Sequence, residues 1–378
     1  MKGKRIVWFA VVALAALWPM CASASGAPGV SAKSAVVVNA DDGRVIYAKN
    51  EHERLAIAST TKIMTSLLTL EASAVNNRVI TVTPEMIRVQ GSSMGLRAGD
   101  RLTLYDLAVG MLMVSGNDAA NTAALSVGGT MENFASMMNA KAVSLGMKDS
   151  HFVTPSGLDN SEHYSSAYDL SLLTCAALQN VQFSKIVCQK SMQIHFINPD
   201  VTNYYGNHNR LLSMYQFCTG VKTGFTQKSG RCLVSSAEKN GVRLIAVTLN
   251  DPNDWDDHKA LLDYGFTQIV SRGMDDSAYR VTIPIVGGVQ GTIQVAGTAS
   301  ENISVGTDDQ IVRRVELPQF VYAPVKRGQV LGRVCYACAG RTVAQTELVA
   351  AEDVSQAPRQ KPWFCLLWDA ITELFSGG

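Results

Sequence analysis

A serine and a lysine lie three residues apart in the stretch IASTTKIMTSLL, residues 57 to 68. The apolar spacing predicts a helix that begins at Ser59, and residues i and i+3 share a helix face, so the Ser59 hydroxyl and the Lys62 amine could meet. A serine beside a base is what nucleophilic catalysis requires. The alternative is that Ser59 and the two threonines after it cap the helix and that Lys62 is solvated in its first turn. The same spacing recurs at Ser236 and Lys239, so the pattern alone is weak.

The place of Lys62 is unusual for a structural lysine. The N-terminal end of a helix dipole repels positive charge, so lysines are favoured at the other end. A catalytic base must instead be a neutral amine, and a helix N-terminus, burial and a neighbouring cation all lower the pKa of a lysine. The position that is unfavourable for an ammonium group therefore favours a base.

A second motif, Ser115-Gly116-Asn117, lies between two predicted helices in TLYDLAVGMLMVSGNDAANTAALSVGG. Thr103 and Asp106 have the spacing of a capping box at the start of the first helix. From the turn between the helices, Ser115 could relay a proton and Asn117 could hold a peptide amide. A turn made of small polar residues is the structural alternative.

A third motif, Lys222-Thr223-Gly224, begins a β-rich run. An extended peptide could pair with such a strand through backbone hydrogen bonds, with Lys222 and Thr223 facing its terminal carboxylate. Lys222 would also be the neighbouring cation that lowers the pKa of Lys62. The order and the predicted local structure of the three motifs match those of serine β-lactamases and penicillin-binding proteins.

The sequence around the motifs predicts an α/β fold. Apolar runs flank the Asp-Gly pair at 42–43 and the Asn-Gly pair at 240–241, as in β-hairpins, and helical periodicity fills the region between them. One domain is therefore expected over residues 30 to 275, with a mainly antiparallel sheet, helices on both faces and a helical insertion. Short β-rich runs separated by Gly, Pro, Asp and Asn predict a small all-β domain over residues 277 to 353.

Both ends of the chain carry segments outside these domains. Residues 1 to 24 combine basic residues, a short apolar run and a small-residue cleavage site, which predicts a secretory signal peptide, with an uncleaved anchor as the alternative. Residues 354 to 361 predict a linker. Residues 362 to 375 have an apolar, aromatic stripe at helical spacing that is too short to span a bilayer, which predicts an amphipathic helix on a membrane surface. The alternative is a helix docked on the protein's own β domain.

Composition limits the partners. The formal net charge is +1 and the charges are spread along the chain, so nucleic acid is not expected as a partner. The histidines are dispersed, and Cys335 and Cys338 form a lone C-x-x-C without a second pair, so no metal is assigned. These cysteines are interpreted as strand and turn residues, with a local disulfide left open. No cofactor is expected.

Longer stretches extend the match beyond the three motifs. They are GSSMGLRAGD, HFVTPSGLDNSEHYSSAYDL, NHNRLL and APVKRGQVLG. From about Ser34 to the C-terminus the chain resembles the D-alanyl-D-alanine carboxypeptidases, the low-molecular-mass penicillin-binding proteins. The resemblance implies a β-lactamase/transpeptidase-like domain, and a reaction in which Ser59 forms an acyl-enzyme with a peptidoglycan stem peptide and terminal D-alanine leaves. It also implies inhibition by β-lactams, a role in cell wall biogenesis and a place on the outer face of the cytoplasmic membrane.

The resemblance suggests roles for further residues. It implies that the backbone amides of Ser59 and Phe225 form the oxyanion hole, that Gly224 belongs to the substrate-binding strand and that Arg210 lies near the site. A solvated surface arginine is the alternative for Arg210. The stretch HYSS, which begins at His163, is expected to be a structural loop rather than a Ser-His pair. Relatives can carry an arginine after the last sheet hairpin, where this chain has the acidic NDPNDWDD, so full neutralisation of the substrate carboxylate stays open.

Two other functions fit part of the sequence. A secreted β-lactamase shares the three motifs, but it needs a carboxylate that positions water, and no Glu-x-x-x-Asn pattern lies between Asn117 and Lys222. A non-catalytic wall-binding protein would have a decayed site, whereas every motif residue is intact. A serine-type D-Ala-D-Ala carboxypeptidase is therefore the expected function.

Overall fold

The structure, a computed structural model, describes residues 26–338, 340–358 and 367–368. The predicted signal peptide and most of the predicted helix over residues 362 to 375 lie outside the described residues. Within the described ranges, no helix combines the length and the apolar character that crossing a membrane requires.

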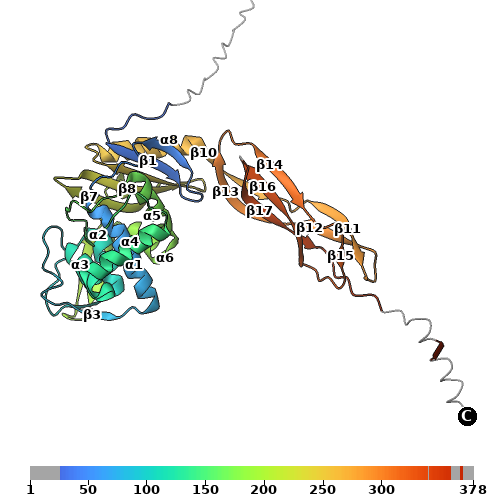
Figure 1. The fold of residues 1–378 in the computed structure, drawn as a ribbon, viewed down its shortest axis with the longest axis horizontal. Coiled ribbons are helices and arrows are strands. Elements are labelled where there is room, and N and C mark those ends of the chain that lie inside the picture. Colours follow the sequence, from blue (N-terminus) through green and yellow to red (C-terminus); the bar gives the residue numbers. More distant parts are fainter. Residues whose placement is uncertain (1–25, 339, 359–366, 369–378) are drawn as a thin grey trace, which may run out of the picture.

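The larger part of the molecule is built on a five-stranded antiparallel sheet with the strand order β2-β1-β9-β8-β7 (Figure 1). Its strands are β1 (Ser34–Asn39), β2 (Val45–Lys49), β7 (Cys218–Thr226), β8 (Gly230–Lys239) and β9 (Val242–Leu249). Strands from the beginning of the described chain thus pair with strands that follow the helical region. β7 is an edge strand, so only one of its sides is paired within this sheet.

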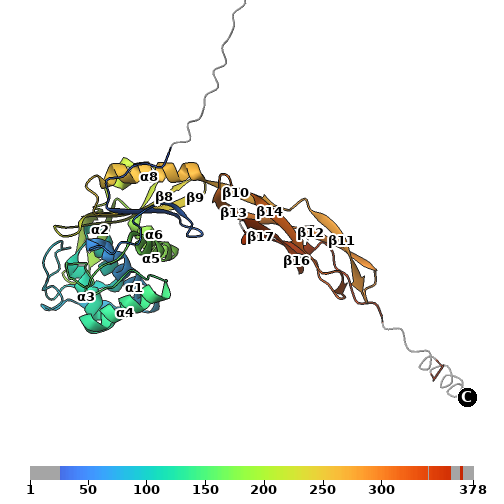
Figure 2. The ribbon, with the colours of Figure 1, turned by 45° about the horizontal axis from the view of Figure 1, so that its top comes forward.

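Helices cover both faces of the sheet (Figure 2). On one face lies α8 (Asp254–Gln268), and on the other lie α1 (Lys62–Val75), α5 (Ala167–Gln179) and α6 (Val181–Val187), with α2 (Leu104–Val114), α3 (Asn117–Gly128) and α4 (Met131–Ser144) beyond them. The alternation of β1 divides the two cores, because Val36 and Val38 face the core of the helical region and Val37 faces the core under α8.

Short elements complete this part. They are the 3-10 helix η1 (Ala58–Thr61), the hairpins β3 (Val79–Thr81) with β4 (Arg101–Thr103) and β5 (Ser191–Phe196) with β6 (Val201–Gly206), and the single helical turn α7 (Leu211–Met214). The β5–β6 hairpin was not predicted from the sequence.

The C-terminal part is all β. β10 (Ile269–Asp275) leaves the larger part and pairs with β13 (Ala299–Gly306). A six-stranded sheet follows, in the order β14 (Ile311–Glu316), β16 (Val330–Cys338), β17 (Arg341–Ala350), β12 (Thr292–Gly297), β11 (Arg280–Val286) and β15 (Val321–Tyr322). Its core includes Ile283, Ile293, Val295 and Leu348. The predicted fold class, an α/β domain of mainly antiparallel sheet followed by a small all-β domain, is confirmed.

Two local predictions are confirmed. Asn240 and Gly241 both have positive φ, 51° and 77°, as a type I′ turn between β8 and β9 requires. Thr103 and Asp106 make both hydrogen bonds of the capping box at the start of α2.

The predicted start of the first long helix is wrong. The segment from Ala58 to Thr61 forms η1, and α1 begins at Lys62 without a side-chain cap. Thr60 Oγ1 donates to the Ile57 carbonyl at 2.6 Å, and Thr61 Oγ1 lies 2.8 Å from His163 Nε2. Because these hydroxyls have other partners and Ser59 does not cap the helix, the capping interpretation of this stretch is excluded.

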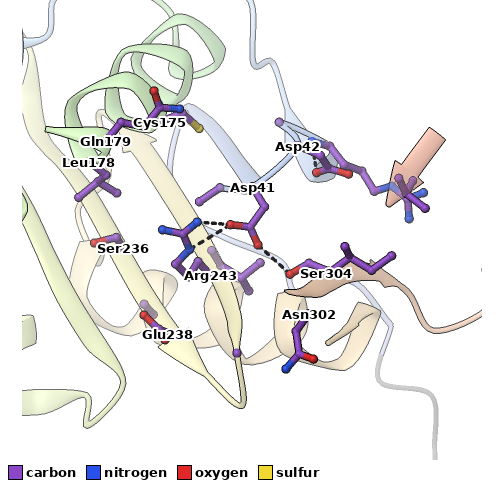
Figure 3. A pocket seen from close by; sticks show the side chains of 18 of the residues that line it. Asp41, Asp42, Cys175, Leu178, Gln179, Ser236, Glu238, Arg243, Asn302 and Ser304 are labelled. Atoms are coloured by element: carbon purple, nitrogen blue, oxygen red, sulfur yellow. Dashed lines mark hydrogen bonds and ion pairs between the residues drawn. The ribbon is translucent and has the colours of Figure 1, made fainter. Parts of the chain in front are cut away.

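The turn between β1 and β2 contacts the C-terminal part. Asp41 accepts hydrogen bonds from Arg243 and, at 2.8 Å, from Ser304 Oγ (Figure 3). Arg44, in the same turn, forms an ion pair with Asp309 at 2.7 Å. A cavity of about 1230 Å³ lies at this joint, and none of the predicted site residues lines it.

The carboxyl groups of Asp251 and of Asp257, which lies in α8, both contact Ser31. Ser31 Oγ lies 2.7 Å from Asp251 Oδ1 and 2.8 Å from Asp257 Oδ2, and Ser31 N donates to Asp257 Oδ2 at 2.6 Å. Asp251 is fully buried, and this burial raises its pKa to about 6. The folded chain therefore retains a proton that the unfolded chain releases near pH 4.

Asp251→Asn is expected to stabilise the protein at neutral pH. The folded-state pKa lies above the unfolded one, so the stabilisation from the protonated carboxyl is complete below about pH 4 and is lost as the pH rises through about 6. An amide does not ionise, so the variant should gain up to about 3 kcal/mol over the wild type near pH 8 and nothing near pH 4. Thermal unfolding at both pH values measures this difference. An equal gain at both would show that ionisation of Asp251 is not the cause.

The described cysteines are all free thiols: Cys175, Cys188, Cys218, Cys232, Cys335 and Cys338. The local disulfide that the C-x-x-C left open is therefore not formed in β16. Among the residues that the structure describes, no three His, Cys, Asp or Glu side chains lie close enough together to hold a metal ion.

Candidate active site

Ser59 lies in η1, and two glycines let other backbone segments pack against this turn. A Cβ atom added at Gly157 would lie 1.9 Å from the Ala58 carbonyl oxygen, and one added at Gly224 would lie 3.0 Å from Ser59 N. Ala58 itself has φ 45°, in a region that residues other than glycine rarely adopt. The turn that carries Ser59 is therefore held from two sides by close backbone contacts.

Lys62 is fully buried directly behind Ser59 and has three polar neighbours. Its Nζ lies 2.9 Å from Ser59 Oγ, 2.7 Å from Asn117 Oδ1 and 2.7 Å from the Ser156 carbonyl oxygen. A neutral amine has two N–H groups and one lone pair. The two carbonyl oxygens can act only as hydrogen-bond acceptors, so each accepts one N–H group of Lys62. The lone pair of Lys62 Nζ is then left to accept the Ser59 hydroxyl proton.

The electrostatics of the site favour this neutral form. Burial holds the pKa of Lys62 well below its usual range, and the charge of Lys222 lowers this pKa further, while Asp118 acts weakly in the opposite direction. Burial and a neighbouring cation are two of the three causes expected from the sequence, the third being the helix N-terminus. The structure thus brings Ser59, Lys62 and Asn117 into direct contact and places Lys222 nearby.

Asn117 and Asp118 begin α3 and hold the loop of residues 90 to 96 at the site. Asn117 Nδ2 donates to the Gln90 carbonyl at 2.6 Å, which leaves its second N–H available. The Asp118 carboxylate accepts hydrogen bonds from the backbone N–H groups of Met94, Gly95 and Leu96 at 2.9 to 3.0 Å. Asp118 was missed from the sequence, because its role depends on a loop that lies more than twenty residues earlier in the chain.

Ser115 ends α2 in the left-handed conformation, with φ 60° and ψ 31°. Its Oγ is buried and has no hydrogen-bond partner among the described residues. A buried hydroxyl without a partner is costly, and at a reactive site it is available to a substrate or to a transferred proton.

Lys222 is a buried cation of β7. Its side chain is 1% exposed, burial lowers its pKa to about 7, and its Nζ donates to the Thr223 carbonyl at 3.0 Å. It forms no ion pair with a carboxylate in the part of the chain that the structure describes. Buried charges are normally paired, so a substrate carboxylate would supply the missing partner.

The remaining residues of the third motif lie along the edge strand. Gly224 approaches Ser59 N, as described above, and the next residue, Phe225, has a 66% exposed side chain. Thr223 is partly buried next to Lys222. The open side of β7 therefore runs past the nucleophile, where an extended peptide could pair with it.

Among the described residues, Arg210 makes no hydrogen bond or ion pair with Ser59, Lys62 or Lys222. Arg210 is exposed at the start of α7, and its side chain has no hydrogen bond or ion pair to another described residue. The charge of Lys222 acts on His208, two residues earlier: partial burial and this charge lower the pKa of His208, and its backbone N donates to the Met113 carbonyl at 3.1 Å. His208 belongs to NHNRLL, but only the arginine of that stretch was predicted to lie near the site.

His163 contacts the turn that carries Ser59 through the Thr61 hydroxyl. Its Nδ1 accepts from the backbone N–H groups of Val153 and Thr154 at 3.0 and 3.2 Å, so Nε2 carries the proton and donates it to Thr61 Oγ1. Burial lowers the pKa of His163 to about 4, so the ring is neutral. The interpretation of HYSS as a structural loop agrees with these contacts.

The acidic stretch after β9 is used inside the protein. Asp254 forms an ion pair with Arg231 at 2.6 Å, and the Arg231 guanidinium lies 5.6 Å from the centre of the Trp255 ring. Asp251 and Asp257 bind Ser31, as described above. These three carboxylates therefore have partners of their own.

The fold and the arrangement of Ser59 and Lys62 define a serine peptidase with a transpeptidase-like fold. A model of the D-alanyl-D-alanine carboxypeptidases, peptidase S11, matches residues 21–253, and a model of the penicillin-binding protein 5 C-terminal domain matches residues 282–356. The chain belongs to the D-alanyl-D-alanine carboxypeptidase family. The family resemblance inferred from the sequence is confirmed.

Individual relatives are similar to this chain over most of its length. Over 340 residues it is 33% identical to D-alanyl-D-alanine carboxypeptidase DacF of Bacillus subtilis, covering 86% of both chains. It is 30% identical over 373 residues to DacC of Escherichia coli, covering 92% of this chain and 90% of that one. The crystal structure of penicillin-binding protein 5 from Haemophilus influenzae is similar with a TM-score of 0.64 and 27% identity, covering 87% of this chain and 99% of that one.

Proposed function

We propose that the protein removes the terminal D-alanine from peptidoglycan stem peptides that end in D-Ala-D-Ala, through an acyl-enzyme on Ser59. In the first step Lys62 Nζ takes the Ser59 hydroxyl proton while Oγ attacks the carbonyl carbon of the penultimate D-alanine. The peptide C–N bond breaks, and the proton passes by way of Ser115 to the leaving amine. In the second step water attacks the ester, the shortened peptide leaves and the Ser59 hydroxyl is restored.

The substrate lies along the open side of β7. Its terminal carboxylate faces Lys222 and Thr223, a peptide carbonyl accepts the second N–H of Asn117, and the backbone amides of Ser59 and Phe225 stabilise the developing oxyanion. The ion pair with Lys222 is the main interaction that binds the terminal carboxylate of the substrate.

The observation that carries the proposal is the set of contacts of Lys62 Nζ. Two fixed acceptors occupy its N–H groups, so its lone pair is aimed at Ser59 Oγ at 2.9 Å. Its lowered pKa keeps the amine neutral. The family name supports the choice of D-Ala-D-Ala as the bond that is cleaved.

Two assays test this proposal. A pentapeptide ending in D-Ala-D-Ala should release one D-alanine, and a fluorescent penicillin should leave a long-lived adduct that peptide mapping places on Ser59. Rapid turnover of the penicillin would instead indicate a β-lactamase, and neither adduct nor D-alanine release would indicate a non-catalytic binder. Loss of activity with a chelator would contradict a reaction without metal.

The biological setting follows from the substrate. The enzyme acts outside the cytoplasm, trims stem peptides during cell wall biogenesis and is inhibited by β-lactams. The signal peptide of residues 1 to 24 exports it, and the segment from 362 to 375 holds it on the outer face of the cytoplasmic membrane as an amphipathic helix. The all-β domain then lifts the active site away from the membrane.

A chain that ends at Gln360 is expected to be soluble and active. The deleted segment carries five or six apolar side chains on one helical face, each worth about 1.5 to 3 kcal/mol when fully buried, and the cost of ordering the segment offsets part of this gain. Fractionation of cells that express the full and the shortened chain measures the change in location. Hydrolysis of a small D-Ala-D-Ala peptide, which does not need the membrane, is the control. A shortened chain that stays on the membrane after signal cleavage, or that loses this activity, would contradict the anchor.

A further inference from the structure

Exposed apolar side chains gather at one end of the all-β domain. Val286 ends β11, Tyr322 ends β15, and the two residues are register partners in parallel strands at the edge of the six-stranded sheet. Phe320 packs edge-on against Tyr322, with ring centroids 5.4 Å apart. Val289 lies in the turn after β11. We call Val286, Val289, Phe320 and Tyr322 the tip patch.

The tip patch faces water in the folded domain. Along β11 the buried residues are Ile283 and Ile285, so Val286 points away from the core. Tyr322 is 69% exposed and Val289 is 62% exposed. Single exposed apolar residues are common, but a cluster with two aromatic rings on an edge strand usually marks a contact surface.

The described chain leaves the domain beside the tip patch. Val289 N donates to the Ser355 carbonyl at 3.0 Å, and Ala357 N donates to the Gly287 carbonyl at 2.8 Å. Figure 1 shows β11 and β15 at the end of the domain far from α1 and α3. Five residues span at most about 18 Å, so a surface that binds the aromatic segment beginning at residue 362 must lie within about that distance of Ala357, beside the tip patch.

We infer that the tip patch inserts into the surface of a lipid bilayer together with the C-terminal segment. Tyrosine and phenylalanine suit the boundary between head groups and acyl chains, because a ring can lie in the apolar layer while the tyrosine hydroxyl stays hydrated. Four side chains cover far less than the roughly 800 Å² per partner of a stable protein interface, which disfavours a second copy of this chain.

Two attachment points would fix the orientation of the domain. With the C-terminal segment as the only attachment the domain could tilt, whereas a bound tip makes the β strands stand away from the membrane. The inference rests on the membrane location proposed above, and it is independent of the reaction at Ser59.

Binding of the full mature chain to vesicles of phosphatidylethanolamine and phosphatidylglycerol tests the inference. Phe320→Ser with Tyr322→Ser should weaken binding by about tenfold, and Val289→Ser by about threefold. Val312→Ser is the matched control, because Val312 is 60% exposed, like Val289 at 62%, but lies in β14 of the same sheet, where Ile311 pairs with Cys338 near the joint. It should not change binding. Labelling by a fluorescent penicillin should be equal in all variants, since none of these residues belongs to the active site.

The outcomes separate the two membrane proposals. If the wild-type chain does not bind the vesicles, both the anchor and the tip insertion are wrong. If the wild type binds, a chain ending at Gln360 does not, and the tip variants bind like the wild type, only the tip insertion is wrong. If the tip variants bind more tightly than the wild type, the patch covers the protein's own C-terminal segment, and this overturns the inference.

Discussion

Lys62→Ala is expected to reduce both D-alanine release and penicillin acylation by about 10⁴-fold or more, and Ser59→Ala to abolish both. The serine hydroxyl is a weak nucleophile without a base, and Lys62 Nζ is the basic group in hydrogen-bond contact with it. The double variant should be no worse than either single variant, because nucleophile and base act as one unit. D-alanine release compares the three variants, and the rate of acylation by a fluorescent penicillin measures the effect of Lys62→Ala on the first step.

The chain contains its own control for this experiment. Ser236 and Lys239 repeat the Ser-x-x-Lys spacing in β8, where Lys239 Nζ lies 4.9 Å from the centre of the Phe217 ring instead of beside a hydroxyl. Lys239→Ala should leave both rates unchanged. Activity that survives Lys62→Ala within tenfold of the wild type would assign the base to another group.

Gly157→Ala is expected to lower kcat/KM by at least about 100-fold and to destabilise the fold by more than about 2 kcal/mol. The added Cβ would lie 1.9 Å from the Ala58 carbonyl oxygen, so the backbone next to Ser59 must move. Movement of the nucleophile by about 1 Å is enough for a loss of this size. Unfolding by denaturant and the acylation rate measure the two effects.

Gly146→Ala separates this contact from simple backbone strain. Gly146 has φ 76°, close to the 81° of Gly157, but an added Cβ at Gly146 meets no atom within 4 Å. It should cost about 1 kcal/mol of stability and leave the acylation rate unchanged. Equal losses of activity in the two variants would show that the contact with Ala58 does not position Ser59.

Local features of the fold were predictable from the sequence. The Asn240-Gly241 turn and the Thr103–Asp106 capping box depend on residues that are neighbours in the chain, so their chemistry can be recognised without tertiary information. The start of the first helix was misjudged, because the competing partner of Thr61 is His163, which lies about a hundred residues away.

The candidate site was predictable as a set of residues but not as a geometry. The three motifs gave Ser59, Lys62, Asn117 and Lys222, and the structure places them together. The third contact of Lys62 is the backbone carbonyl of Ser156. Every residue has such a carbonyl, so the sequence cannot indicate which one contacts Lys62. The close contact of Gly157 with Ala58 could not be predicted either, because the sequence does not distinguish Gly157 from the other glycines.

The buried Lys222 has a consequence for the heat and protons exchanged on ligand binding. With a pKa of about 7, much of the free enzyme carries a neutral Lys222 near pH 8. A carboxylate placed against it favours the ammonium form, so binding of a peptide acid draws a proton from the buffer. Calorimetry in two buffers of different ionisation enthalpy should report the uptake of up to about one proton near pH 8 and much less near pH 6. The affinity for peptide acids would fall as the pH rises above 7, while that for the corresponding amides would not.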